Sequence, residues 1–197
     1  MRLWTSPPPA QVPLGGRAKA VATVASAFAD DPVERWLWPE DDEYAAHFPA
    51  FVEAFAGPAF ERDTAWMLDS YSAIALWLAP GAEPDGESIV GLLSETVAAA
   101  RHEDTFAVLQ QMEESHPSAP HWYLPWLAVE HSLHGKGLGS TLLTQCLSHV
   151  DASGLPAYLE TPNPRTIPLY ERHGFKVTAV AQAGDCPPIT QMLRKSS

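Results

Sequence analysis

The stretch "LAVEHSLHGKGLGSTLL", residues 127–143, decides the fold because it joins an apolar, strand-like segment to a helix through closely spaced glycines. Gly135, Gly137 and Gly139 stand at alternate positions directly before an apolar run with helical periodicity. The first turn of a helix carries unpaired N–H groups and a positive partial charge, and glycines let a ligand approach without meeting Cβ atoms. The stretch therefore predicts a phosphate or pyrophosphate site.

The glycine spacing separates the known phosphate-binding motifs. A P-loop pattern, G-x-x-x-x-G-K-[ST], is absent from the sequence. The dinucleotide pattern G-x-G-x-x-G/A fails because Ser140 or Leu142 stands at its third position, although Glu160 lies about twenty residues further on, where a ribose-binding acid belongs. A flexible turn before a core helix is a further alternative.

Composition bounds the kind of protein. The chain has 197 residues, of which 46% are hydrophobic and 18% charged, so we expect a single domain over residues 1–197. Its 12 Lys and Arg against 24 Asp and Glu argue against nucleic acid and favour a cationic ligand. Cys146 and Cys186 are too few for a disulfide framework, and neither an apolar leader nor a membrane-spanning run is present. These features predict a cytoplasmic location with no membrane partner.

The apolar spacing predicts alternating helices and strands. Expected helices cover residues 17–32, 41–58 (ended by Gly57 and Pro58), 86–115 in two pieces, 138–150 and 164–174; expected strands cover 65–68, 73–78, 123–129, 156–161 and 175–180. Pro125 cannot donate to a sheet, so it predicts a bulge or a place where neighbouring strands part. The pattern indicates one mixed α/β sheet.

Two motifs resemble one family. The glycine stretch resembles the acetyl-CoA-binding segment of the GNAT superfamily of N-acetyltransferases, a strand followed by Q/R-x-x-G-x-G/A and a helix, with His134 at the Gln/Arg position. "NPRTIPLYERHGF", residues 163–175, resembles the closing helix and strand of the same superfamily. Together with "AFADDP" and "PAYLET", these segments are most similar to puromycin N-acetyltransferase-like members.

The resemblance implies a GNAT fold, whose mixed sheet is flanked by helices and splays at the cofactor strand, with acetyl-CoA as cofactor. The backbone of that strand would pair with the pantetheine amides, and an N–H of Ala128 or Val129 would stabilise charge on the thioester oxygen. The expected coenzyme contacts are Leu127, Ala128, Val129, His134, Gly135, Lys136, Gly137, Leu138, Gly139, Ser140 and Asn163, of which Asn163 suits a helix cap equally well.

Acetyl transfer to an amine needs an acid for the leaving sulfur and a base for the amine. Tyr170 matches the family tyrosine that faces the coenzyme sulfur, although by itself it could be a core aromatic residue. Glu160 interrupts an apolar strand and is the candidate base, unless it ends the strand facing solvent.

The acceptor pocket is expected near the acidic stretch "DDPVERWLWPEDDE", where Trp36 and Trp38 are tentative substrate contacts. The alternative is a solvated acidic loop with ordinary core tryptophans. His131 and His134 have metal-like spacing but no third ligand nearby, so we expect no metal.

The sequence thus predicts an enzyme that transfers acetyl from acetyl-CoA to a primary amine of a small molecule, by direct attack in a ternary complex. Two alternatives stay open: a protein or peptide N-acetyltransferase, and a catalytically silent acyl-CoA-binding regulatory module. The protein is expected to act as a monomer or homodimer.

Overall fold

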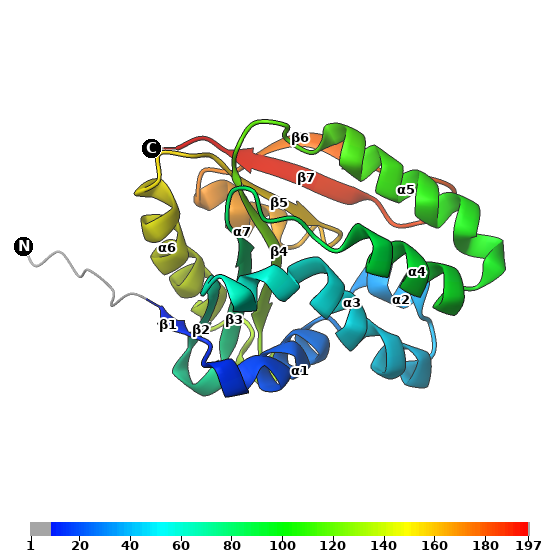
Figure 1. Ribbon diagram of the computed structural model, residues 1–197, viewed down its shortest axis with the longest axis horizontal. Coiled ribbons are helices and arrows are strands. Elements are labelled where there is room, and N and C mark those ends of the chain that lie inside the picture. The colour runs from blue at the N-terminus through cyan, green and yellow to red at the C-terminus, as the bar shows by residue number, and fades with distance from the viewer. Residues whose placement is uncertain (1–8, 197) are drawn as a thin grey trace, which may run out of the picture.

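A computed structural model of the protein describes residues 9–196 (Figure 1). Residues 1–8, on which much of the expectation about a leader rests, lie outside the described residues. Within residues 9–196, seven strands form one open sheet in the order β1-β2-β3-β4-β5-β7-β6, antiparallel except for the pair β4 and β5. The strands are β1 (Ala10–Gln11), β2 (Ala65–Leu68), β3 (Ala73–Leu78), β4 (Trp122–Val129), β5 (Ala157–Thr161), β6 (Lys176–Ala181) and β7 (Ile189–Arg194).

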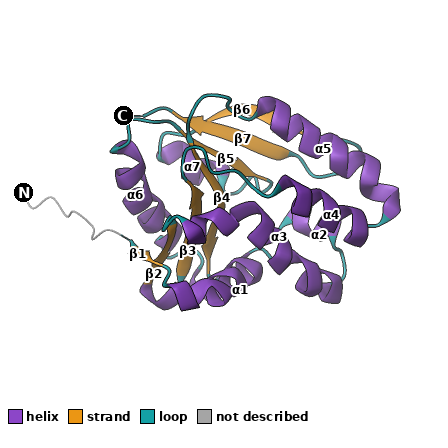
Figure 2. Ribbon diagram, in the orientation of Figure 1, coloured by secondary structure: helices purple, strands orange, loops and turns teal. Residues whose placement is uncertain are grey.

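Helices cover both faces of this sheet, as Figure 2 shows. They are α1 (Arg17–Ala27), α2 (Pro32–Leu37), α3 (Asp41–Glu61), α4 (Gly86–Thr96), α5 (His102–Ser115), α6 (Leu138–Asp151) and α7 (Ile167–Arg172). Helices α1 to α5 share one apolar core with the sheet, whereas α6 and α7 share a second core. The mixed α/β architecture that the sequence predicts is therefore confirmed. None of the helices in the described range combines the length and apolar character needed to cross a bilayer.

Strand β3 separates the two cores. All of its residues are buried, and successive side chains point to opposite faces. Ile74 and Leu76 belong to the core under α1 to α5, whereas Ala75 and Trp77 belong to the core under α6. Burial on both faces explains why this strand reads as a continuous apolar run.

Helix α3 corrects one prediction. The helix does not end at Gly57 and Pro58 but continues to Glu61. A proline in a helix leaves the carbonyl four residues earlier without its N–H partner. For Pro58 that carbonyl is Ala54 O, and it accepts a hydrogen bond from the N–H of Asp85 instead, at 2.8 Å between N and O. A contact from a distant segment therefore allows the helix to continue.

Strand β1, helix α2 and strand β7 were not predicted. The segment after Pro32 was expected to be a loop between helices, but it forms α2, whose N-terminus is capped by Asp31. Strand β7 was missed because its polar residues obscure the alternation. Gln191, in the middle of β7, is fully buried and donates to Met112 O at 3.1 Å.

Strand β4 has the irregularity that Pro125 predicts. Opposite Trp77 of β3, β4 has two residues, Leu124 and Pro125, which makes a bulge. On its other side, β4 pairs with β5 only over residues 122–124. Beyond Leu124 the two strands part, so the predicted bulge and the predicted splay are both confirmed.

Candidate active site

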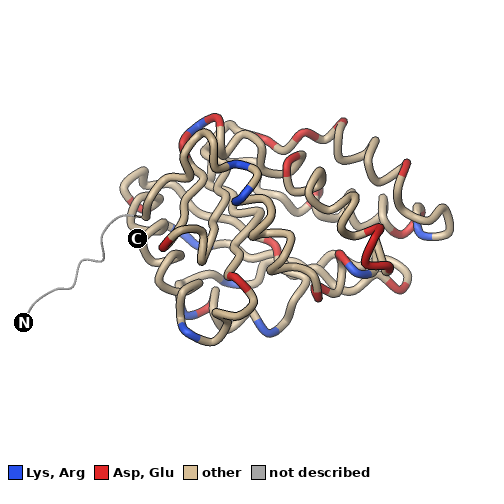
Figure 3. The backbone as a smooth tube through the Cα atoms, turned by 90° about the horizontal axis from the view of Figure 1, so that it is seen from below, with Lys and Arg blue, Asp and Glu red and all other residues tan. Residues whose placement is uncertain are grey.

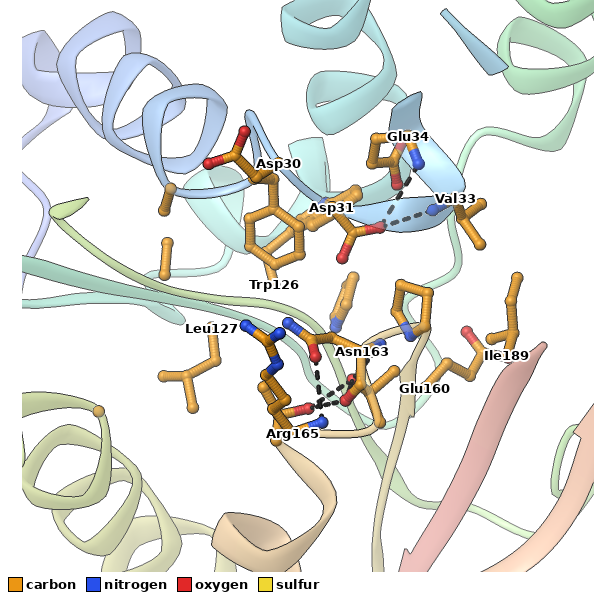
Figure 4. A pocket seen from close by; sticks show the side chains of 18 of the residues that line it. Asp30, Asp31, Val33, Glu34, Trp126, Leu127, Glu160, Asn163, Arg165 and Ile189 are labelled. Atoms are coloured by element: carbon orange, nitrogen blue, oxygen red, sulfur yellow. Dashed lines mark hydrogen bonds between the residues drawn. The ribbon is translucent and has the colours of Figure 1, made fainter. Parts of the chain in front are cut away.

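A cavity of about 850 Å³ lies where β4 and β5 part. Its volume is within the range of roughly 300–1,000 Å³ that is usual for ligand pockets. One wall comes from α2, α3 and α5, and the other from β4, the start of α6 and the segment between β5 and α7. Figure 4 shows these two walls facing each other, with Asp31 and Glu34 on one and Asn163 and Arg165 on the other.

The glycine loop forms one end of the cavity. Gly135 and Gly137 have positive φ values of 74° and 80°, which residues with a Cβ rarely adopt. A Cβ added at either position would meet no atom within 4 Å, so space is open beside the backbone. The first helical bond runs from Thr141 N to Gly137 O, so the preceding N–H groups of α6 have no partner within the helix. This arrangement fits the pyrophosphate of a coenzyme.

The edge of β4 that faces the cavity has unpaired backbone groups. The N–H of Glu130 donates to Ser72 O on the β3 side at 3.0 Å. Because successive N–H groups along a strand point to opposite sides, those of Leu127 and Val129 face the cavity and that of Ala128 faces β3. The structure therefore favours Val129 over Ala128 as the donor to a thioester oxygen.

The expected coenzyme contacts lie along the cavity with one exception. The lining includes Leu127, Ala128, Val129, His134, Gly135, Gly137, Leu138, Gly139, Ser140 and Asn163. Lys136 is not part of the lining, because its Nζ turns to Ser132 O at 3.3 Å.

Three of these side chains already have partners within the protein. His134 Nε2 lies 2.8 Å from Val129 O, and Ser140 Oγ lies 2.8 Å from His173 Nε2. Asn163 Oδ1 accepts from Arg165 N at 3.0 Å, so Asn163 holds the turn before α7, although the N-cap of that helix is Thr166 and not Asn163. Their remaining polar groups are the ones left for a coenzyme.

Two arginines that the sequence analysis did not single out also line the cavity. Arg165 and Arg172 lie before and at the end of α7, close to the expected coenzyme loop. Their charge is complementary to phosphate. Their position inside the second family motif was the signal that could have identified them.

Tyr170 lies on α7 with its side chain in the cavity wall and is 7% exposed. Its ring packs edge-on against Phe175, with the centroids 5.9 Å apart. No group in the described part of the chain hydrogen-bonds its hydroxyl. Burial and the negative charge of Asp31 raise the pKa of Tyr170, so the hydroxyl keeps its proton.

Glu160 points into the cavity from β5 and does not face solvent at a strand end. Its two oxygens accept hydrogen bonds from Tyr123, at 2.6 Å, and from Tyr158, at 2.8 Å. Burial raises the pKa of its carboxyl group, which strengthens it as a base once it is ionised. Tyr123, which the sequence analysis did not name, lines the same cavity.

Comparison with known proteins agrees with this geometry. The acetyltransferase (GNAT) family model matches residues 24–175. The chain belongs to the GNAT family. It is an acetyl-CoA-dependent N-acetyltransferase with the GNAT fold, and members of its family use acetyl-CoA.

Individual relatives of this N-acetyltransferase agree with that assignment. An uncharacterized N-acetyltransferase of Schizosaccharomyces pombe is 26% identical over 177 residues, which cover 80% of this chain and 69% of that protein. A crystal structure from Corynebacterium glutamicum, described as histone acetyltransferase HPA2 and related acetyltransferase, is 27% identical, with a TM-score of 0.66 and 98% of each chain covered. Arylalkylamine N-acetyltransferase 2 from Aedes aegypti shares the fold alone, with 10% identity, a TM-score of 0.65, and 95% of this chain and 98% of that chain covered.

The two tryptophans of the acidic stretch lie in different places in this N-acetyltransferase. Trp36 lines the cavity, and its Nε1 donates to Asp185 Oδ1 at 3.0 Å. Trp38 is fully buried in the core and donates to Thr96 Oγ1 at 3.1 Å. Trp38 lies outside the cavity lining, so the tentative assignment of Trp38 as a substrate contact is corrected: it has the core role that was the alternative.

The same stretch supplies carboxylates that face the cavity. Asp31 and Glu34 are 6% and 5% exposed, and both line the cavity. Asp31 Oδ1 accepts from Val33 N at 3.0 Å and from Glu34 N at 3.4 Å. Burial raises the pKa of Asp31 to about 6, and burial together with the charge of Asp31 raises the pKa of Glu34. The α2 wall of the cavity is therefore acidic.

Proposed function

We propose that the protein acetylates a primary amine of a small molecule by direct attack on acetyl-CoA in a ternary complex. The observation that carries the proposal is that one cavity joins a glycine-rich helix start to a wall of buried carboxylates. The first feature suits the phosphates of the coenzyme, and the second suits an ammonium group.

The coenzyme would lie along the splayed edge of β4. Acetyl-CoA supplies an activated acetyl thioester there. The cavity-facing N–H groups of Leu127 and Val129 would pair with the amides of the pantetheine arm and with the thioester oxygen. The start of α6, Arg165 and Arg172 would bind the phosphates.

Two proton transfers are assigned to residues of the chain. Tyr170 would give its hydroxyl proton to the leaving sulfur. The amine proton would pass to the Tyr123 oxygen while Tyr123 gives its own proton to Glu160 Oε2, along the existing 2.6 Å hydrogen bond. The attacking amine is the neutral form, whose ammonium proton has already passed to solvent. Its second proton ends on Glu160, while Tyr170 ends as a phenolate, and transfer of one proton from Glu160 to Tyr170 through solvent restores both groups.

Direct attack is also supported by the state of the thiols. Cys186 lines the cavity, but burial raises the pKa of its thiol to about 11. The thiolate is the nucleophilic form of cysteine, so this thiol is poorly suited to carry the acetyl group. Cys146 is buried in the core between α6 and the sheet.

The proposal extends to the family subtype, the cellular location and a second class of acceptor. The puromycin N-acetyltransferase-like subtype rests on the motifs "GKGLGS" and "LYERHGF". A cytoplasmic location rests on the two free, buried cysteines. The description of the Corynebacterium neighbour names histones, so a lysine-containing peptide is the second acceptor class to examine.

The first test is acetyl-CoA binding, followed by an acceptor screen. Acetyl-CoA at about a hundred times its dissociation constant should add roughly 2.7 kcal/mol to stability, whereas NAD and ATP should not. CoA release is then measured with small primary amines and with lysine peptides. Turnover of small amines is the expected result. Turnover of peptides alone, or stabilisation by NAD alone, would overturn the proposal.

A further inference from the structure

We propose that Asp31 and Glu34 form the site that recognises the acceptor as a cation, by holding its ammonium group between the two carboxylates. The proposal rests on the amine acetylation proposed above and adds the charge of the acceptor and the residues that bind it. The pair lies on the cavity wall opposite Asn163 and Arg165 (Figure 4).

The first observation is an unsatisfied carboxylate oxygen. Glu34 Oε2 is buried and has no hydrogen-bond partner within the described residues. Leaving a buried polar group unpaired costs about 1–3 kcal/mol, and more when the group is charged. Such a group needs an explanation, and a ligand that donates hydrogen bonds supplies one.

Helix capping does not explain Glu34. Asp31 is the N-cap of α2, and Glu34 follows three residues later, as in a capping box. In that motif the glutamate would accept the N–H of Asp31, but this N–H donates to Phe28 O at 2.9 Å. Asp31 therefore caps the helix without help, and the carboxylate of Glu34, a residue that lines the cavity, takes no part in the cap.

No cation of the protein neutralises the pair. In the chain from residue 9 to residue 196, the ion pairs are Arg17 with Glu53, Arg35 with Asp41 and Arg194 with Asp151. Arg35, which follows Glu34 in the chain, turns toward α3, where it binds Asp41 and packs over the Tyr44 ring. Arg165 and Arg172 line the opposite wall and form no ion pair with Asp31 or Glu34. The positive charge that such a pair requires must come from a ligand.

Other unsatisfied atoms lie in the same cavity. Of the six buried side-chain N and O atoms without a partner in the described residues, three belong to cavity-lining residues: Glu34 Oε2, Thr105 Oγ1 and Trp126 Nε1. Thr105 is on α5, whose start is tied to α2 by the bond from Arg101 Nη1 to Trp36 O at 2.6 Å. By contrast, both oxygens of Glu160 already accept hydrogen bonds. Two of these three unpaired atoms, from Glu34 and Thr105, therefore belong to the wall that α2 and α5 form.

Aromatic side chains define the rest of the acceptor. The rings of Phe28, Phe51 and Phe55 surround Trp126, with centroid distances of 5.1, 6.3 and 6.1 Å, and all four residues line the cavity. Apolar surface of this kind binds an apolar or aromatic body, while the acids bind its ammonium group. The acceptor class is a primary ammonium on an apolar or aromatic body.

Binding of such a cation should release a proton. Two neighbouring buried carboxyls cannot both ionise easily, so the empty pair holds a proton that is lost to buffer when an ammonium takes its place. The charged and titratable groups around the pair are Asp30, Arg35, Tyr44 on α3, Tyr170 on α7 and Cys186. The thiol of Cys186 is in turn affected by the charges of Asp104 and Asp185. If a positively charged side chain of the protein already neutralised the pair, binding of the ammonium would release no proton.

The test uses 2-phenylethylamine and hexylamine as probes in the absence of acetyl-CoA, so that no transfer occurs. The uncharged 2-phenylethanol and hexan-1-ol are the matched ligands. The variants are Glu34→Gln and Thr105→Val, with Glu40→Gln as the control, since Glu40 is exposed outside the cavity and loses the same charge. Affinity and heat are measured by calorimetry in two buffers of different ionisation enthalpy.

We expect Glu34→Gln to weaken amine binding by about tenfold or more and to abolish proton release, while alcohol and acetyl-CoA affinities stay as in the wild type. Thr105→Val should weaken amine binding by a smaller factor, and Glu40→Gln should change nothing. Equal amine affinity in Glu34→Gln and wild type, or no binding of either amine to the wild type, would overturn the site. If the amines bind in a Glu34-dependent way but no amine is acetylated, the proposed function fails and the site stands.

Discussion

Tyr170 has a hydroxyl with no partner in the described chain, and the mechanism proposed above assigns it the proton for the leaving sulfur. We expect Tyr170→Phe to lower kcat by about 10²-fold or more, because general acid catalysis is lost, while the KM for acetyl-CoA is kept. Steady-state kinetics measure both. Tyr71→Phe is the control, because Tyr71 lies outside the cavity lining. An unchanged kcat in Tyr170→Phe would contradict the mechanism.

Glu160 should make the reaction rate fall at low pH. A base must be ionised to accept a proton, and burial raises the pKa of Glu160 above its ordinary value of 4.5. Activity is therefore expected to fall as the pH drops through this raised pKa and to be fully present above it. Glu160→Gln should lose most of the activity at every pH, and Tyr123→Phe should lose it while keeping the carboxylate. If the activity of Glu160→Gln fell at low pH in the same way as that of the wild type, a group other than Glu160 would be responsible for the pH dependence.

Two glycines allow the effect of backbone strain to be measured separately from the effect of steric crowding, because an added Cβ would meet no neighbouring atom at either position. Gly137 has φ 80°, so Gly137→Ala should cost roughly 1–2 kcal/mol of stability and weaken acetyl-CoA binding. Gly91→Ala, inside α4 with no atom within 4 Å of the added Cβ, should instead gain about 0.5–1 kcal/mol. Thermal unfolding with and without acetyl-CoA measures both. Equal stability changes in the two variants would contradict this account.

Most elements could be predicted because their apolar periodicity is local. The hairpin of β2 and β3, the strand with Pro125, and the glycine loop with α6 follow directly from residue spacing. What could not be predicted depends on distant partners. Pro58 stays within α3 because Asp85 bonds Ala54 O, and Gln191 is tolerated in β7 because it bonds Met112 O. No sequence window around either residue contains its partner.

In the candidate site too, features formed by neighbouring residues could be predicted, whereas contacts between distant residues could not. The backbone cradle was predictable because glycines and a helix start are contiguous in the chain. The contact between Glu160 and Tyr123 was not, because Tyr123 lies 37 residues away in the chain. Trp36 and Trp38 illustrate the limit most directly. They are two residues apart in an acidic stretch, yet one lines the cavity and the other is in the core.

The net charge of the whole molecule should affect the rate at which each of the two substrates binds. The formal net charge is −12, and acidic positions outnumber basic ones along the chain (Figure 3). Raising ionic strength from about 0.01 M to 0.15 M shortens the screening length from roughly 30 to 8 Å. We expect kcat/KM for a cationic amine to fall over this range and kcat/KM for acetyl-CoA to rise or hold. The rates at saturating substrate serve as the control, and a rising value for the amine would contradict the expectation.

The parting of β4 from β5 has a consequence for how the family could diversify. Helices α1 to α5, encoded before β4, supply most of the proposed acceptor wall, to which β4 adds Trp126, whereas β4, α6 and α7 supply the proposed coenzyme wall. We therefore expect mutations in α1 to α5 to alter the choice of amine more than they alter acetyl-CoA binding. Chimaeras joined just before β4 would exchange selectivity while inheriting the chemistry unchanged.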